Sequence, residues 1–401
     1  MKYLNFTKKT LDEHLKLWIY CKIRDLYKTD PYFGHVDNDI LLSSLALALF
    51  KASTFDELIA MLDDEYKNGI KITRKIKTDS VLYFEYPSLV FQIKSLVKLW
   101  PKFVDIYKGH PKDECSSFGH RPNLIDEDSN LVSTNDRHIN SPKKVKFQEQ
   151  YVDFENHAYG IANDIVKSSV DGSIRAVVVQ TDIKSFFHAL NLTQLSEYFD
   201  RHLKDNFLAT YFRELQGYDF SGALPIGWSF SGFVADLLLR NIHKSINANF
   251  SALFHKRIGM DIDKRLRKFF PDVKITTELI EYVHKKVAAS DIKFESSSSF
   301  VDDFIFILSL RQVPIADSTE VGEDAFEKII VDVAIEVANK IMNDHYGYDS
   351  LKFYNLDEGK GKYFSFNHSN IASFKTNFHK FQGFQSYGDD QVGLWAMLDD
   401  F

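Results

Sequence analysis

Apolar residues recur along the chain with two periods, one typical of strands and one typical of helices. The runs at 176–179 and 304–308 are short, apolar and rich in β-branched or aromatic residues, so both predict buried strands. A further strand is expected at 81–84. Helical spacing of apolar residues is found at 10–27, twice within 38–62, and at 89–100, 161–169, 192–215 (with Thr193 as N-cap), 260–270 and 323–343. The pattern therefore predicts a mixed α/β protein.

Two adjacent acids, Asp302 and Asp303, lie between a polar run at 295–299 and the apolar run at 304–308. This order predicts a β-hairpin that holds both carboxylates at its tip. Turns favour Asp for backbone reasons alone, so the pair by itself is equally compatible with an ordinary turn. A third acid, Asp182, follows the strand predicted at 176–179. We expect Asp182 at a strand end that faces a cleft.

A loop containing Pro and Gly begins at Leu224 and runs through Ser231 into the apolar segment 232–239, which predicts the start of a helix. Three segments, taken in order, resemble motifs A, B and C in the palm of the reverse transcriptases. They are Asp182-Ile183-Lys184-Ser185-Phe186-Phe187, Leu224-Pro225-Ile226-Gly227-Trp228-Ser229-Phe230-Ser231 and Phe300-Val301-Asp302-Asp303. The resemblance covers residues 176–310 and continues more weakly to 385.

Other segments are similar to further motifs of the same family. Asn355, followed by Lys360 and Lys362, is similar to motif D. The segment Phe381-Gln382-Gly383-Phe384 is similar to the hairpin of motif E, the primer grip. Tyr159-Gly160 resembles the segment that precedes motif A in bacterial reverse transcriptases.

The resemblance implies an α/β right-hand polymerase with an antiparallel palm sheet backed by helices and with helix-rich fingers. Few residues follow the motif E segment, so the thumb is expected to be reduced, or to be absent and replaced by a partner protein or an RNA. Six parts are expected: a helical N-terminal and fingers region (1–108), fingers loops (109–160), palm with motifs A and B (161–244), an insertion (245–290), palm with motifs C, D and E (291–385) and a C-terminal tail (386–401).

The implied chemistry is attack of a primer 3′-hydroxyl on the α-phosphate of a nucleotide, assisted by two divalent cations. Mg²⁺ prefers carboxylate oxygens and is the expected ion, with Mn²⁺ as the alternative. Asp182 and Asp302 are expected to bridge the two ions. The Ile183 carbonyl would add a ligand, and Asp303 would support the site or bind weakly.

The same motifs imply contacts to nucleotide and primer. Phe187 takes the place of the aromatic residue that excludes a 2′-hydroxyl, so dNTPs are the expected substrates, with a core Phe as the alternative. Lys360 or Lys362 is expected to neutralise or protonate the pyrophosphate leaving group, unless both are only solvated. The expected pocket residues are Pro225, Ile226 and Gly227, and the expected template or primer contacts are Trp228, Ser231, Phe381 and Gly383.

The formal net charge of −7 argues mildly against nucleic-acid binding, although local basic patches matter more than the total. Each basic patch is also compatible with an ordinary solvated face. The three patches are Lys67, Lys71, Arg74, Lys75 and Lys77; Lys143, Lys144 and Lys146; and Lys256, Arg257, Lys264, Arg265, Arg267 and Lys268. The second patch, with Arg121 and Arg137, holds the candidates for binding the triphosphate. The third is expected to contact template or a partner chain.

The sequence lacks a transmembrane segment, a signal peptide and a disulfide pattern, and these features bear on the cellular compartment and on the redox state of the cysteines. No run of 18 apolar residues occurs, and the first residues lack the apolar segment of a signal peptide, so we expect a soluble cytoplasmic protein that binds no membrane. Cys21 and Cys115 match neither a metal-binding spacing nor a disulfide framework. Reduced structural thiols are expected.

No maturase, endonuclease, integrase or RNase H segment is visible, which disfavours a self-mobilising element. The short chain and its long N-terminal helical region resemble the bacterial antiphage reverse transcriptases of the abortive-infection and defence-associated groups. The resemblance implies an RNA-directed or template-independent DNA polymerase that acts with a noncoding RNA, often as an oligomer or with a partner protein. One alternative is a retron-type enzyme that makes a small RNA-linked DNA. Another is a polymerase-like scaffold that binds nucleic acid without turnover.

Overall fold

A computed structural model of the chain describes most of the region between residues 143 and 374 and parts of the region before it. The described residues are 38–66, 71–76, 81–86, 143–169, 172–203, 206–215, 223–224, 231–311, 320–358 and 360–374, with shorter stretches within 11–23 and 89–95 and single residues at 117 and 313.

The helices are α2 (Asn38–Lys51), α3 (Phe55–Tyr66), α5 (Lys143–Lys167), α6 (Phe186–Ala189), α7 (Leu192–Leu203), α8 (Asn206–Leu215), α9 (Ser231–Arg257), α10 (Ile262–Phe269), α11 (Thr277–Ala289) and α12 (Glu320–Tyr346). Two 3₁₀ helices are η4 (Leu356–Glu358) and η5 (Ile371–Ser373). A separate two-stranded antiparallel hairpin contains β1 (Lys71–Ile76) and β2 (Val81–Tyr86), which confirms the strand expected at 81–84.

The main sheet has four antiparallel strands in the order β4-β5-β3-β6: β4 (Asp291–Phe300), β5 (Asp303–Arg311), β3 (Ile174–Asp182) and β6 (Lys362–Phe366). Strands β5 and β6 flank β3, so α12, which connects them, crosses over β3. This is the split β-α-β arrangement of a β-α-β-β-α-β unit. It confirms the crossover expected for the helix at 323–343.

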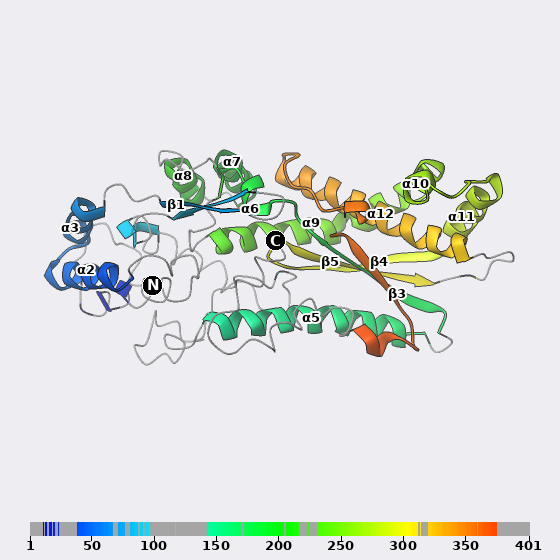
Figure 1. The fold of residues 1–401 in the computed structure, drawn as a ribbon, viewed down its shortest axis with the longest axis horizontal. Helices are drawn as coiled ribbons and strands as arrows, with labels where there is room; N and C mark the ends of the chain where they lie inside the picture. Colours follow the sequence, from blue (N-terminus) through cyan, green and yellow to red (C-terminus); the bar gives the residue numbers. More distant parts are fainter. Residues whose placement is uncertain are drawn as a thin grey trace.

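Helices cover both faces of the main sheet (Figure 1). Helix α5 runs along one face, and α9 and α12 lie on the other. Covered on both sides, the central strands β3 and β5 are apolar at successive positions and not only at alternate ones. Residues 176–179 and 304–308 are all buried, as their sequence pattern predicts.

The helix pair expected within 38–62 is confirmed as α2 and α3. Thr54 and Glu57 begin α3 with reciprocal hydrogen bonds. The Glu57 N–H donates to Thr54 Oγ1 (3.2 Å), and the Thr54 N–H donates to Glu57 Oε2 (3.3 Å). Each side chain satisfies a backbone donor that the first helical turn leaves open. Most of 10–27 and 89–100 lies outside the described residues.

The expectation of loops up to residue 160, with a helix only from 161, is wrong because α5 already begins at Lys143. Tyr151, Phe154, Ala158 and Ala162 are buried and recur at spacings of three and four. Such a stripe is enough to pack a helix against a sheet. The basic run at the start of the helix obscured this period in the sequence.

The helix expected at 192–215 is two helices, α7 and α8. Its expected N-cap is also wrong, because Asn191 and not Thr193 caps α7. Asn191 Oδ1 accepts the N–H groups of Thr193 (2.8 Å) and Gln194 (3.3 Å). Asn is among the best capping residues because its short side chain reaches these donors.

The segment expected as an insertion from residue 245 has no structural boundary at that point. Helix α9 continues from Ser231 to Arg257 without a break. The helix expected at 260–270 is confirmed as α10, and both α10 and α11 contact α12. Within the described part of the chain, no helix combines the length and apolar character that a membrane crossing requires.

Two histidines at the contact between α7 and α12 predict a loss of stability in acid. Burial, followed by repulsion from His202 and Arg201, lowers the pKa of His345 to about 4, and burial also lowers the pKa of His202. The unfolded chain takes up protons below about pH 6.5, where the folded chain resists them, so the free energy of unfolding falls from about pH 6.5 towards 4. We expect His345→Gln to flatten this dependence in urea unfolding between pH 7.5 and 4.5. The exposed His284, changed to Gln, should leave it unaltered.

Candidate active site

Three carboxylates meet where β3 ends beside the hairpin of β4 and β5. Asp182, the last residue of β3, lies directly opposite Asp303, the first residue of β5. The Ile183 N–H donates to the carbonyl oxygen of Asp302 at 3.0 Å, which ties the hairpin turn to the chain just after Asp182. The three acidic residues are only 4–6% exposed. The structure thus brings together acids that are 120 positions apart in sequence.

The turn that carries Asp302 is strained. Phe300 and Asp303 are cross-strand partners, so Val301 and Asp302 form a two-residue hairpin turn. Val301 has φ of 55°, a left-handed conformation that is rare for a β-branched residue and that such a turn normally assigns to Gly. Strain of this kind persists only where the surrounding packing enforces it, and it is common at functional sites. Buried Phe300, which contacts the rings of Tyr151 and Phe154, supplies such packing.

Two lysines lie over one aromatic ring beside the acids. Lys360 Nζ is 3.7 Å from Asp182 Oδ2 and 4.9 Å from the centroid of the Tyr354 ring. Lys184 Nζ is 5.3 Å from the same centroid. The Tyr354 N–H donates to the Asp182 carbonyl oxygen (2.9 Å), so the ring is fixed to the end of β3. Lys184 and Tyr354 were not singled out from the sequence, although Lys184 is only two residues from Asp182.

Helix α5 brings Tyr151 close to the three acids, from the face of the sheet opposite α9 and α12. Burial raises the pKa of the Tyr151 phenol far above its ordinary value, and the negative charges of Asp303, Glu155 and Asp182 raise it further. Tyr151 is therefore a neutral hydrogen-bond donor at physiological pH. The sequence did not suggest Tyr151 because residues 109–160 were interpreted as loops.

A buried histidine on α9, His243, packs against the hairpin of β4 and β5. His243 Nδ1 is 2.7 Å from Ser297 Oγ, and Nε2 is 2.8 Å from Ser299 Oγ. The imidazole also stacks on Phe304, with 4.6 Å between centroids. It therefore contacts both arms of the hairpin. Burial, followed by repulsion from His157, lowers the pKa of His243 to about 3, so the ring is neutral at physiological pH.

The donor atoms of His243 can be assigned from these contacts. Ser297 Oγ donates to Asn247 Oδ1 at 3.0 Å. A hydroxyl has one proton, so Ser297 must accept from His243, whose Nδ1 then carries the hydrogen. Nε2 is left to accept from the Ser299 hydroxyl. The ring thus joins two buried serines of β4 without any charge.

The carboxylates suit a divalent cation in their chemistry and position. Opposed acids on adjacent strands repel one another, and a hard cation such as Mg²⁺, which takes carboxylate and carbonyl oxygens, would relieve that repulsion. The carboxylates do not form a complete coordination site. Among the described residues, no group of three or more His, Cys, Asp or Glu side chains is close enough to hold a metal ion as it stands.

The other expected site residues are placed in different ways. Phe187 is half-buried on α6, with its ring centroid 5.3 Å from that of Phe186, and Ser231 is buried as the first residue of α9. Lys362 is exposed and opposes Gln180 in the sheet, so Lys360 is the lysine with the contact to Asp182.

The remaining expectations are not tested by the described residues. Lys143, Lys144 and Lys146 lie in the first turn of α5, and their side chains are not described. The residues that lie outside the description are Arg121, Arg137, Pro225, Ile226, Gly227, Trp228, Phe381 and Gly383. Their expected roles stay predictions.

Comparison with known proteins adds no family assignment. No protein-family model matches the sequence, and no curated protein matches it significantly. The function must therefore be inferred from the geometry of the site and the order of its short motifs.

Proposed function

We propose that the chain is a DNA polymerase of the reverse transcriptase type, which transfers dNTPs to a primer with RNA as template or without a template. The observation that carries this proposal is the placement of Asp182 opposite Asp303, with Asp302 in the adjoining turn. In this proposal the four-stranded sheet with α9 and α12 is the palm. Two Mg²⁺ ions, when bound, would lower the pKa of the attacking hydroxyl and offset charge on the reacting phosphate.

Each carboxylate has a distinct task in this proposal. Asp182 and Asp302 would hold the ions, and Asp303 would support them from the first position of β5. The Ile183 carbonyl would offer an additional oxygen at the same strand end. Tyr151, neutral and buried behind the acids, orients a carboxylate by donating its hydroxyl hydrogen, because a hydrogen bond to a charged acceptor is stronger than one to a neutral acceptor.

The lysines beside Tyr354 provide the positive charge that a triphosphate requires. Lys360, next to Asp182, neutralises the departing pyrophosphate, and Lys184 extends the same cationic edge. The Tyr354 ring attracts both ammonium groups to its negative face. Each ammonium group also pairs with a carboxylate, Lys360 with Asp182 and Lys184 with Glu358, so a triphosphate would compete with these partners for the positive charge.

Phe187 is proposed to exclude ribonucleotides by occupying the space beneath the sugar. We expect Phe187→Ala to raise incorporation of rNTPs relative to dNTPs by about tenfold or more, because the variant leaves room for a 2′-hydroxyl. Parallel single-nucleotide extension assays measure the ratio. Phe364→Ala, a change of a half-buried Phe on β6, is the control. An unchanged ratio in the Phe187 variant would assign this ring to the core alone.

The proposed biological role is bacterial antiphage defence, with a noncoding RNA, a DNA product and an oligomer or partner protein. This role depends on the motif resemblance and not on the geometry. A retron-type enzyme would differ in leaving its DNA joined to an RNA. Nuclease treatment and sequencing of the product distinguish the two.

The direct test is DNA synthesis by the purified chain with its co-purified RNA, Mg²⁺ and each dNTP omitted in turn. Incorporation of labelled dNTPs that is lost on chelation by EDTA and restored by Mg²⁺ is the expected result. Incorporation of only some bases would favour the defence role. No incorporation with any RNA or DNA primer, together with unchanged nucleic-acid binding, would favour the scaffold alternative.

A further inference from the structure

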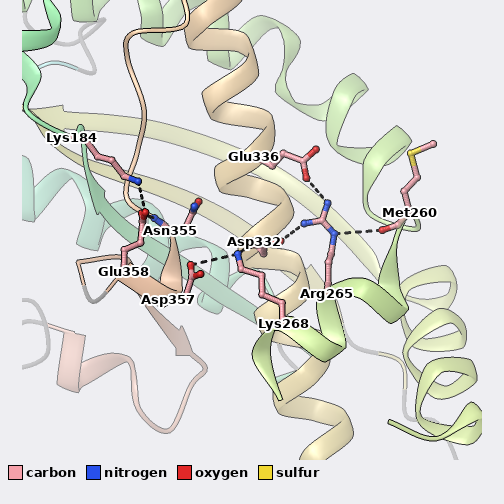
Figure 2. A network of polar contacts seen from close by, with 9 residues as sticks. All are labelled: Lys184, Met260, Arg265, Lys268, Asp332, Glu336, Asn355, Asp357 and Glu358. Atoms are coloured by element: carbon pink, nitrogen blue, oxygen red, sulfur yellow. Dashed lines mark hydrogen bonds and ion pairs between the residues drawn. The ribbon is translucent and has the colours of Figure 1, made fainter. Parts of the chain in front are cut away.

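Two basic residues of α10, Arg265 and Lys268, contact acidic residues of neighbouring elements (Figure 2). Arg265 is buried, and its guanidinium hydrogen-bonds to Asp332 and Glu336 of α12. Its Nε also donates to the Met260 carbonyl oxygen at 3.5 Å. Arg265 therefore fixes α10 against α12, and the expectation that it contacts template or a partner chain is wrong.

Lys268, one turn nearer the end of α10, connects two parts of the fold. Its Nζ is 3.1 Å from Asp332 Oδ1 on α12 and 3.5 Å from Asp357 Oδ1 on η4. Asp332 thus binds both Arg265 and Lys268. The pair with Asp332 holds the Lys268 side chain within reach of η4. Arg267, on the same helix, pairs only with Asp263 within α10 in the described contacts.

At its other end, η4 contacts the residues that follow β3, the strand that carries Asp182. Glu358 accepts the Asn355 N–H at 2.7 Å and pairs with Lys184. Partial burial raises the pKa of Glu358, but the hydrogen bonds from Lys184 and the Asn355 N–H lower it overall, so the carboxylate is charged. Thr181 Oγ1 donates to the Tyr354 carbonyl at 2.8 Å, next to the Tyr354 N–H contact with Asp182.

The segment between Asn355 and Gly361 closes on itself beside Lys360. A Cβ at Gly361 would lie only 2.7 Å from the Asn355 carbonyl oxygen, so only Gly permits this approach of backbone to backbone. Lys360 is therefore held on a short closed segment with η4 inside it. The 3₁₀ helix η4 and Lys360 are thus parts of one short segment, and Lys360 contacts Asp182.

We propose that α10 positions Lys360, with Lys268 and Asp357 as the residues that connect the helix to the Lys360 segment. This inference rests on the proposed function for the role of Lys360. In this inference, α10 helps to hold the active site in place. Lys268 and Asp357 touch no reacting group, so they are positioning residues.

The test compares Lys268→Gln, Asp357→Asn and the double variant with Lys268→Arg, which keeps the charge, and with the control Arg267→Gln. Hydrogen exchange at the Tyr354 and Glu358 amides reports on the segment, and single-turnover dNTP incorporation reports on Lys360. The side chains of Lys268 and Asp357 are 36% and 48% exposed, so the contact is of the weak, exposed kind. In Lys268→Gln and Asp357→Asn we therefore expect hydrogen exchange at the two amides to be about two- to fivefold faster. We expect kcat to be about two- to fivefold lower, with KM for dNTP unchanged.

The double variant should behave like Lys268→Gln, because that change already removes the pair with Asp357 together with the pair with Asp332, whereas Asp357→Asn removes only the pair with Lys268. Lys268→Arg and Arg267→Gln should resemble the wild type. Unchanged exchange in both single variants would overturn the inference whatever the activity. Faster exchange in a chain that incorporates no nucleotide would contradict the proposed function and leave the link between α10 and η4 supported.

Discussion

Asp182→Asn is expected to reduce dNTP incorporation by about a thousandfold or more while the protein stays folded. The carboxylate is proposed to hold both metal ions, and charge stabilisation by such ions contributes several kcal/mol, where each 1.4 kcal/mol is a factor of about ten in rate. Asn keeps the size of Asp and removes only the negative charge. Primer extension under single-turnover conditions measures the loss.

A thermal-shift experiment separates this loss from unfolding. Without metal, Asp182→Asn should be about as stable as the wild type, because relief of the repulsion among three neighbouring carboxylates offsets loss of the pair with Lys360. Added Mg²⁺ should raise the melting temperature of the wild type and have a much smaller effect on the variant, since only binding to the folded state stabilises it. Asp200→Asn, a change of an exposed acid on α7, should match the wild type in both measurements. Full activity of Asp182→Asn would contradict the polymerase proposal.

The sequence predicted the centre of this fold better than its periphery. The apolar runs before Asp182 and after Asp303 predicted the two central strands because a strand covered on both faces must be apolar throughout. The hairpin at Asp302 followed from a polar run, two acids and an apolar run. Convergence of the three acids depended on register, which no local pattern contains. Only the order of the motifs indicated it.

The supporting residues were missed for physical reasons that differ from one to the next. Tyr151 lies in a segment whose charged start resembled a loop, although its apolar stripe continues to Ala162. His243 belongs to a helix predicted only at its start, and its partners are serines of β4, a polar run that would normally be exposed. Lys268 was read as surface charge, and its contact with Asp357 depends on the packing of α10 against α12. Tertiary pairing of this kind leaves no periodic signal.

His243→Leu is expected to destabilise the protein by about 2–4 kcal/mol, because it leaves the buried hydroxyls of Ser297 and Ser299 without the imidazole. Leu fills much of the same volume, so the loss is one of hydrogen bonds more than of packing. The shift in the urea unfolding curve measures it. The exposed His255 on the same helix, changed to Leu, should shift the curve by less than about 0.5 kcal/mol.

A rescue experiment tests the assigned cause. Replacing both serines with Ala in the His243→Leu background removes the unsatisfied hydroxyls. Asn247, which loses its hydrogen bond from Ser297, is exposed and can bond to water, so most of the stability should return. Incorporation of dNTPs should not return with it, since the rescued core no longer has the polar contacts through which His243 ties the hairpin of β4 and β5 to α9. Stability that is unaffected by His243→Leu would show that the imidazole does not hold the hairpin. If rescue of stability also restored full incorporation, His243 would be a packing residue with no influence on the position of the carboxylates.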